Sequence, residues 1–245
     1  MGRIKRSVTL VCWNCDKPYT RSPSLAEGSK YCCRLCASLY KTKQRIKHRQ
    51  ENIKPSSNRS RVADRLSIKL DAIEYHDAVR RITVEAFSAS EFGHNGEADL
   101  IERLRSRCKH LLSLIAFRGE PVGHILFTPV SIHSDHGQLR GMGLGPLSVL
   151  PDYQRRGIGS KLVVSGLEKL KARGIPFVAV IGHPEYYTRL GFEPASKFGI
   201  VHGFRSIPQS MLFIYPSDHT QLLSLGAGTA LYQPEFGTQD DSTLR

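Results

Sequence analysis

The sequence lacks the features that mark several large classes of proteins. It has no run of about 18 apolar residues, which a membrane-spanning helix requires. Its basic start, residues 1–6, is not followed by the apolar segment of a secretory signal. It contains no Gly-x-x-x-x-Gly-Lys-Ser/Thr, and no Gly-x-Gly-x-x-Gly follows the first expected strand. We therefore expect a cytoplasmic protein that does not span a membrane and has neither of these two phosphate-binding loops.

Acidic residues are scarce in the first quarter of the chain. The 245 residues include 35 Lys and Arg against 22 Asp and Glu, a formal net charge of +13. Residues 1–64 hold 15 of the basic and 4 of the acidic residues, so the remainder of the chain is close to neutral. Such a basic segment favours contact with nucleic-acid or ribosomal RNA phosphates, although the same composition is typical of a solvated linker.

Composition divides the chain into three parts. We expect a small cysteine-bearing domain over residues 1–42, a basic linker over 43–64 and a globular domain over 65–240. The linker assignment follows from its Lys and Arg content, Pro55 and a Ser/Asn cluster.

The cysteines of the first part have the spacing of a metal site. Cys12-x-x-Cys15 is followed, after 16 residues, by Cys32-Cys33-x-x-Cys36. A segment this short cannot bury enough apolar surface to fold alone, and a reducing cytoplasm disfavours disulfides. We predict a structural Zn²⁺ held by Cys12, Cys15, Cys36 and either Cys32 or Cys33.

The same segment resembles small bacterial and phage treble-clef fingers that end in Lys-Tyr-Cys-Ser-x-x-Cys. That resemblance favours Cys32 as the fourth ligand and places Cys33 at the serine position. Similar fingers often accompany DNA-handling proteins, so the resemblance also supports a nucleic-acid partner.

From Leu66 onward, strand and helix patterns alternate, which predicts an α/β (α+β) fold with a mixed sheet and helices on both faces. The expected strands are Leu66–Leu70, Leu111–Phe117, Pro121–Ile132, Gly143–Leu150, Phe177–Ile181 and Met211–Tyr215. The expected helices are Tyr75–Phe87, Glu97–Arg107, Ile158–Ala172 and a short one that starts at Pro184 and ends at Gly191.

One strand runs directly into a glycine-bearing turn that opens a helix, over residues 144–160. The first amides of a helix have no intrahelical partner and carry partial positive charge, so they bind anions. Gly157 and Gly159 leave the main chain open to a phosphate, although the same glycines could only permit tight packing. A ligand lying along the strand with its phosphates at the helix has the shape of acyl-coenzyme A.

This segment resembles a known superfamily. Gln154-Arg-Arg-Gly157-Ile-Gly159 matches the Gln/Arg-x-x-Gly-x-Gly/Ala signature of the GNAT acyl-CoA-dependent N-acyltransferases. The segments Gly123–Phe127, Leu144–Val149 and Tyr186–Phe192 follow in the order seen in a bacterial subgroup of predicted N-acetyltransferases. The resemblance implies the GNAT fold, with a mixed, mostly antiparallel sheet flanked by helices, and acetyl-CoA as cosubstrate.

The resemblance also implies a cofactor site. Acyl-CoA would lie between two splayed parallel strands, and the strand segment Leu147-Ser148-Val149 would offer backbone groups to its pantetheine arm. The amides from Arg155 to Ser160 would hold the pyrophosphate. The cofactor-binding residues are therefore expected to be Leu147, Ser148, Val149, Gln154, Arg155, Arg156, Gly157, Ile158, Gly159 and Ser160.

Transfer from a thioester to an amine requires a neutral amine, a donor to the oxyanion and a proton for the leaving thiolate. The resemblance places the acid tyrosine at Tyr187, four residues before Gly191, with Tyr186 as an adjacent alternative. For the base the sequence leaves four candidates open, or a water chain in place of any single base. These candidates are Glu97, His124, His183 and Glu185.

We therefore expect an N-acetyltransferase that moves an acetyl group from acetyl-CoA to a primary amine, with the finger tethering it to nucleic acid or a protein. The alternative is a zinc-finger nucleic-acid-binding protein that carries an inactive, CoA-sensing domain. The acceptor is not identified by the sequence. Loops around His133–Gly141 and Lys197–Ile207 are expected to line its side of the site.

Overall fold

The computed structural model describes residues 8–12, 18–21, 30, 37, 41, 65–88, 96–237 and 239. The chain divides into two compact units, Met1–Arg59 and Ser60–Arg245. No helix of the described residues is long and apolar enough to cross a membrane.

In the first unit, strands β1 (Val8–Val11) and β2 (Pro18–Arg21) pair antiparallel. Cys12, directly after β1, is buried and forms no disulfide. Within the described part of the chain, no group of three or more His, Cys, Asp or Glu side chains is placed to hold a metal ion. The other predicted zinc ligands, Cys15, Cys32, Cys33 and Cys36, and the predicted linker 43–64 lie outside the described residues.

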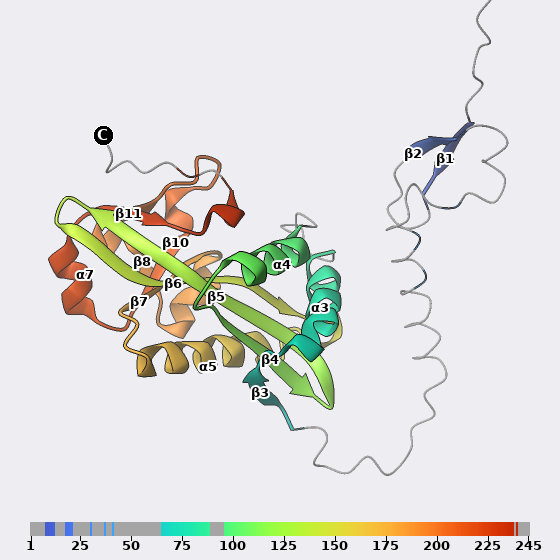
Figure 1. Cartoon of the computed structure of the whole chain (residues 1–245), viewed down its shortest axis with the longest axis horizontal. Coiled ribbons are helices and arrows are strands. Elements are labelled where there is room, and N and C mark those ends of the chain that lie inside the picture. The colour runs from blue at the N-terminus through green and yellow to red at the C-terminus, as the bar shows by residue number, and fades with distance from the viewer. Residues whose placement is uncertain are drawn as a thin grey trace, which may run out of the picture. The chain divides into compact units, whose positions relative to one another are not determined.

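The described residues of the second unit form one mixed sheet of nine strands (Figure 1). The strand order is β3-β4-β5-β6-β7-β10-β8, and β11 pairs with both β5 and β9. The β6–β7 and β9–β11 pairs are parallel and the other pairs are antiparallel. The strands are β3 (Ser67–Leu70), β4 (Leu112–Arg118), β5 (Glu120–Ser134), β6 (Gly137–Val149), β7 (Phe177–Ile181), β8 (Glu193–Pro194), β9 (Ile200–His202), β10 (Leu212–Pro216) and β11 (Gly228–Leu231).

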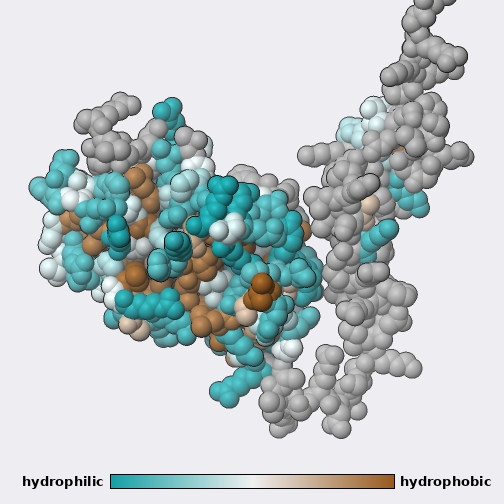
Figure 2. Space-filling view, in the orientation of Figure 1, coloured by the Kyte–Doolittle hydropathy of each residue, from teal (hydrophilic) through white to brown (hydrophobic). Residues whose placement is uncertain are grey.

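Helices cover both faces of this sheet. Successive side chains of a strand point to opposite faces. Leu126 of β5 packs with α3 and α4, whereas Phe127 packs against α5. Figure 2 shows apolar side chains between α4 and α5, where the sheet lies, and hydrophilic ones over the helices. The helices are α3 (His76–Ser88), α4 (Glu97–Arg107), α5 (Ile158–Ala172), α6 (Pro184–Tyr187) and α7 (His219–Leu225).

Helix α5 lies closely against the sheet because Gly166 has no side chain. A Cβ at Gly166 would come within 2.3 Å of the Phe127 ring. The apolar side chains that the helical spacing places on one face are all buried in the main core: Ile158, Leu162, Val163, Leu167 and Leu170. This packing fixes the position of the first turn of α5 relative to the end of β6.

Most of the expected elements are confirmed, and α4, α5 and β7 have the predicted bounds. The prediction of a loop around His133–Gly141 is wrong. β5 extends to Ser134 and β6 begins at Gly137, so this segment is the end of a hairpin. The stretch Lys197–Ile207 also contains a short strand, β9, that pairs with β11. Helix α7 and strand β11 were not expected from the sequence.

Candidate active site

Strands β6 and β7 separate partway along the sheet. Their parallel pairing is limited to Met142 with Val178 and Gly143 with Ala179. Strand β6 continues to Val149, while β7 pairs along its whole length with β10 on its other side. The β5–β6 register shifts at Gly145-Pro146, where proline has no amide hydrogen to donate. Gly143 is therefore the point at which the two parallel strands part.

The backbone of β6 beyond this point faces the side that β7 has left. In an antiparallel pair, opposed residues alternate between bonding one another and pointing outward. The Leu150 amide donates to the Val122 carbonyl at 2.9 Å, so Ser148 bonds across to His124. Leu147 and Val149 must then point away from β5. The Gln154 side-chain amide confirms this for Val149, because it donates to that residue's carbonyl at 3.0 Å.

The loop from β6 to α5 is shaped by residues with positive φ angles. Arg155 has φ of 55° and Gly157, the residue before α5, has φ of 78°. A Cβ at Gly157 would meet nothing within 4 Å, so the backbone angle and not the space favours glycine there. No described side chain caps this helix start. Arg155 and Arg156 are exposed beside it, and Arg156 lies over the Tyr153 ring.

Gly159 is required for a different reason. A Cβ at this position would lie 2.9 Å from the hydroxyl oxygen of Tyr186. Tyr186 also forms a side-chain hydrogen bond with Ser160, which lowers the tyrosine pKa against the larger, raising effect of burial. The Tyr186 hydroxyl therefore packs onto the first turn of α5.

Tyr187 points elsewhere. Its ring lies against Gly182, where a Cβ would come within 2.4 Å, and meets Phe192 edge-on at 5.4 Å between centroids. Burial raises the pKa of Tyr187 well above its usual value, and the neighbouring Tyr186 adds to this. Its hydroxyl has no hydrogen-bond partner among the residues that the structure describes. The two adjacent tyrosines, of which the resemblance favoured Tyr187 as the acid, are therefore in distinct environments.

The candidate bases are dispersed. The Glu97 carboxylate accepts a hydrogen bond from the Gly96 amide at the start of α4. His183 and Glu185 are exposed residues at the start of α6. No contact within the described residues brings any of these three side chains to Tyr187.

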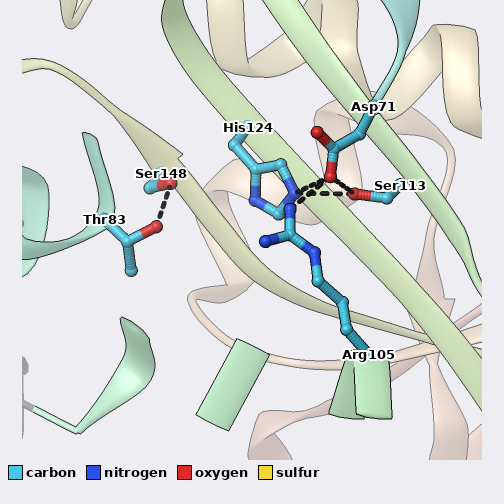
Figure 3. A network of polar contacts seen from close by, with 6 residues as sticks. All are labelled: Asp71, Thr83, Arg105, Ser113, His124 and Ser148. Atoms are coloured by element: carbon cyan, nitrogen blue, oxygen red, sulfur yellow. Dashed lines mark hydrogen bonds and ion pairs between the residues drawn. The ribbon is translucent and has the colours of Figure 1, made fainter. Parts of the chain in front are cut away.

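His124, on β5, belongs to a buried polar network (Figure 3). Its Nε2 lies 2.8 Å from the Ser113 hydroxyl, which donates to Asp71, and Arg105 pairs with the same carboxylate. Burial lowers the pKa of His124 to about 3, with Arg105 and His76 contributing in the same direction. So weak a base is unsuited to deprotonating an amine, and His124 is better explained as part of the core.

Figure 3 also shows a link between the candidate cofactor strand and α3. The Ser148 hydroxyl lies 3.2 Å from that of Thr83, and both residues are buried. On the same helix, Glu85 has a buried carboxylate oxygen without a partner, and burial raises its pKa. Glu85 is thus a further carboxylate near the end of β6 that the sequence pattern of α3 did not single out.

The model of the acetyltransferase (GNAT) domain matches residues 68–195, which is more than half of the chain. The chain belongs to the GNAT acetyltransferase family, the enzyme class expected from its sequence.

Among its relatives are two Escherichia coli (strain K12) proteins, both named as uncharacterized N-acetyltransferases. YjhQ is 41% identical over 108 residues, or 43% of this chain and 60% of its own length. YhbS is 32% identical over 115 residues, or 46% of this chain and 68% of its own length. The chain therefore spans somewhat less than two thirds of YjhQ and slightly more than two thirds of YhbS.

Two solved structures share the fold. A GNAT family acetyltransferase from Brucella melitensis, in complex with acetyl-CoA, has 27% identity and a TM-score of 0.58, over 71% of this chain and 99% of its own. The E. coli YhbS structure, in complex with CoA, has 24% identity and a TM-score of 0.60, over 73% of this chain and 96% of its own. The second of these likenesses concerns the fold alone.

Proposed function

We propose that this protein transfers an acetyl group from acetyl-CoA to a primary amine by direct attack of the amine on the thioester. The observation that carries the proposal is the separation of β6 from β7 after Gly143, with the backbone of Leu147 and Val149 facing the side that β7 has left. The relatives named above as acetyltransferases, and the acetyl-CoA complex of the Brucella protein, support the same cosubstrate.

The residues from Leu147 to Ser160 fit the two ends of such a cosubstrate. The outward carbonyl of Leu147 and the outward amide of Val149 suit the amides of a pantetheine arm, because they can pair as an added strand would. The first-turn amides of α5 suit the diphosphate, with Arg155 and Arg156 adding positive charge. Ser148 is committed to β5 and Thr83, and Gln154 to the Val149 carbonyl, so these two residues position the site.

Tyr187 is suited to protonate the leaving thiolate. Burial raises the pKa of Tyr187, so the phenol stays protonated and its proton is available when the C–S bond breaks. The amine nitrogen forms a bond to the acyl carbon as the C–S bond breaks. The sulfur takes the Tyr187 proton, and the proton that the amine loses restores the phenol through water. We assign the outward Leu147 amide as the donor to the oxyanion.

Thiol release provides the test of this function. Purified full-length protein is titrated with acetyl-CoA by calorimetry, and release of free CoA is then followed with spermidine, a lysine-containing peptide and an aminoglycoside as acceptors. We expect Tyr187→Phe to lower kcat by about 100-fold, the lower end of the contribution of a positioned acid, with little change in acetyl-CoA affinity.

Tyr75→Phe, in a ring that packs on Phe117, is the matched control and should keep the wild-type rate. An unchanged kcat for Tyr187→Phe would show that Tyr187 is not the acid that protonates the thiolate. If acetyl-CoA binds but no free CoA is released with any of the three amines, the CoA-sensing alternative would be favoured.

We also propose that the first unit binds a structural zinc ion through Cys12, Cys15, Cys36 and Cys32 or Cys33. The spacing of these cysteines and the burial of Cys12 beside a two-stranded hairpin support this proposal. Elemental analysis of the purified protein should give one zinc per chain. Cys33→Ser should keep the metal and Cys32→Ser should lose it if Cys32 is the ligand, and the reverse result would assign Cys33.

The positive charge of residues 1–64 supports a nucleic-acid partner for this unit. Binding to a duplex should then weaken steeply with salt.

A further inference from the structure

Tyr232, immediately after β11, has a buried hydroxyl without a hydrogen-bond partner among the described residues. Buried hydroxyl groups in native proteins nearly always have a partner, because an unpaired one loses its hydrogen bonds to water. A phenol whose only role was packing would be equally well served by phenylalanine. Packing in the core therefore does not explain why this residue carries a hydroxyl.

The surroundings of Tyr232 fix its orientation. The Gln239 side chain binds its backbone twice, accepting from the Tyr232 amide at 2.8 Å and donating to its carbonyl at 3.2 Å. The ring meets Phe236 edge-on at 5.7 Å and Phe204 at 5.6 Å between centroids. The next residue, Gln233, donates to the Pro129 carbonyl on β5 at 2.7 Å. Backbone and ring are both held in place, whereas the hydroxyl has no partner within the part of the chain that the structure describes.

Tyr232 lies at the point where β6 and β7 part. A Cβ at Gly143 would come within 2.7 Å of the Tyr232 ring, so the ring occupies the space that a side chain of β6 would fill there. Tyr187 is close enough that a negative charge on it raises the pKa of Tyr232, in addition to the larger effect of burial. Two phenols from distant parts of the chain therefore approach the same end of the paired strands.

The position of Gly143 relative to the cosubstrate decides what Tyr232 would contact. If the diphosphate lies at the start of α5 and the pantetheine arm follows Val149 and Leu147, the thioester points toward Gly143. This step rests on the proposed function. Groups at Gly143 are then beyond the thioester, on the side from which the acceptor must approach.

We propose that the Tyr232 hydroxyl belongs to the acceptor half of the site and accepts a hydrogen bond from an N–H of the attacking primary amine. A neutral phenol has acceptor lone pairs for this bond and a proton of its own to donate. Holding one N–H in this way directs the nitrogen lone pair toward the acyl carbon. This hydrogen bond transfers no proton. The protons exchanged in the reaction are therefore still those of the amine, the released thiol and Tyr187.

The test compares Tyr232→Phe with the wild-type full-length chain and with Tyr75→Phe as the matched control. We expect Tyr232→Phe to lose about tenfold in kcat/KM for whichever of spermidine, the lysine-containing peptide or the aminoglycoside the wild type acetylates best, as expected for one hydrogen bond. Its dissociation constant for acetyl-CoA should stay within twofold of wild type. Its Tm without ligands should be unchanged or higher, because the variant removes a hydroxyl that has no partner.

Three results would overturn the inference. A wild-type kcat/KM in Tyr232→Phe shows that the hydroxyl does not touch the amine. A fall in Tm of several degrees, together with weaker acetyl-CoA binding, shows that it has a structural role instead. Absence of acetyl-CoA binding by the wild type removes the proposed function and this inference together, which distinguishes that failure from the first.

Discussion

The contact between Tyr186 and Gly159 gives a stability prediction that can be worked out from distances. A methyl group added at Gly159 would lie 2.9 Å from the Tyr186 hydroxyl oxygen, which also bonds to Ser160. The next nearest atoms, on Leu147 and Val149, are 3.8 Å away and would be in ordinary contact. The hydroxyl is thus the one group that conflicts with an alanine at this position.

Two opposing terms set the magnitude. Replacing glycine by alanine in a helix gains about 1 kcal/mol of helix propensity. Overpacking costs about 1–3 kcal/mol, and loss of the Tyr186–Ser160 hydrogen bond costs about 1 kcal/mol more. Gly159→Ala should therefore lower the free energy of unfolding by about 1–3 kcal/mol. In a Tyr186→Phe background the conflict is gone, and the same change should raise it by up to about 1 kcal/mol.

A double-mutant cycle measures this coupling directly. Urea unfolding of the four proteins is followed by far-UV circular dichroism, since the single tryptophan, Trp13, lies in the first unit. We expect a coupling energy of about 2–4 kcal/mol. Tyr187→Phe replaces Tyr186→Phe in the control cycle and should leave the cost of Gly159→Ala unchanged, because the Tyr187 ring lies on Gly182. Additive effects in the first cycle, or equal coupling in both, would refute the placement of Tyr186.

Two further predictions concern the core. Because the folded pKa of His124 lies below its usual value, the unfolded chain binds more protons between about pH 6.5 and 3. The contribution of His124 to the free energy of unfolding should be fully present above pH 6.5, and about 4 kcal/mol of it should be lost as the pH drops toward 3. His124→Gln should flatten that part of an acid-unfolding profile, and an unaltered slope would contradict the assignment. Gly166→Ala should destabilise by about 1–3 kcal/mol in denaturant because its methyl would overlap the Phe127 ring, whereas Lys169→Ala on the exposed side of α5 should be close to neutral.

Elements that depend on local pattern could be predicted from the sequence with their correct ends. Helix α5 has its apolar residues at helical spacing, a glycine before its start and another two residues after its end. Strand β7 is a short apolar run. By contrast, β11 exists because Gly228–Leu231 pairs with β5 and β9, which are distant in sequence. The sequence predicts a loop at the polar end of the β5–β6 hairpin, because this segment lacks an apolar alternation. Its backbone pairing is nevertheless continuous there.

The tyrosine pair shows a second limit of the sequence. Tyr186 and Tyr187 are adjacent in a short helix, where neighbouring side chains point about 100° apart. One therefore faces the first turn of α5 and the other the interior beside Phe192. Composition does not distinguish them, because both residues have the same chemistry and differ in the direction that the helix gives them. Only the family resemblance, through the distance of four residues to Gly191, favoured Tyr187.

The two halves of the candidate site differ in how they are encoded, and this explains why the donor was easier to infer than the acceptor. The donor half is a continuous stretch from the end of β6 into α5, so its strand, turn and helix can be read together. The proposed acceptor half depends on Gly143 and Tyr232, which come from separate elements, and Tyr232 lies outside the residues that match the family domain. Family membership therefore defines the chemistry of the donor, whereas under the proposal for Tyr232 selection among amines would depend on long-range packing of the C-terminal segment. Substitutions that change the preferred amine without changing acetyl-CoA affinity are expected around Phe204, Tyr232 and Phe236, where that segment meets β5 and β6.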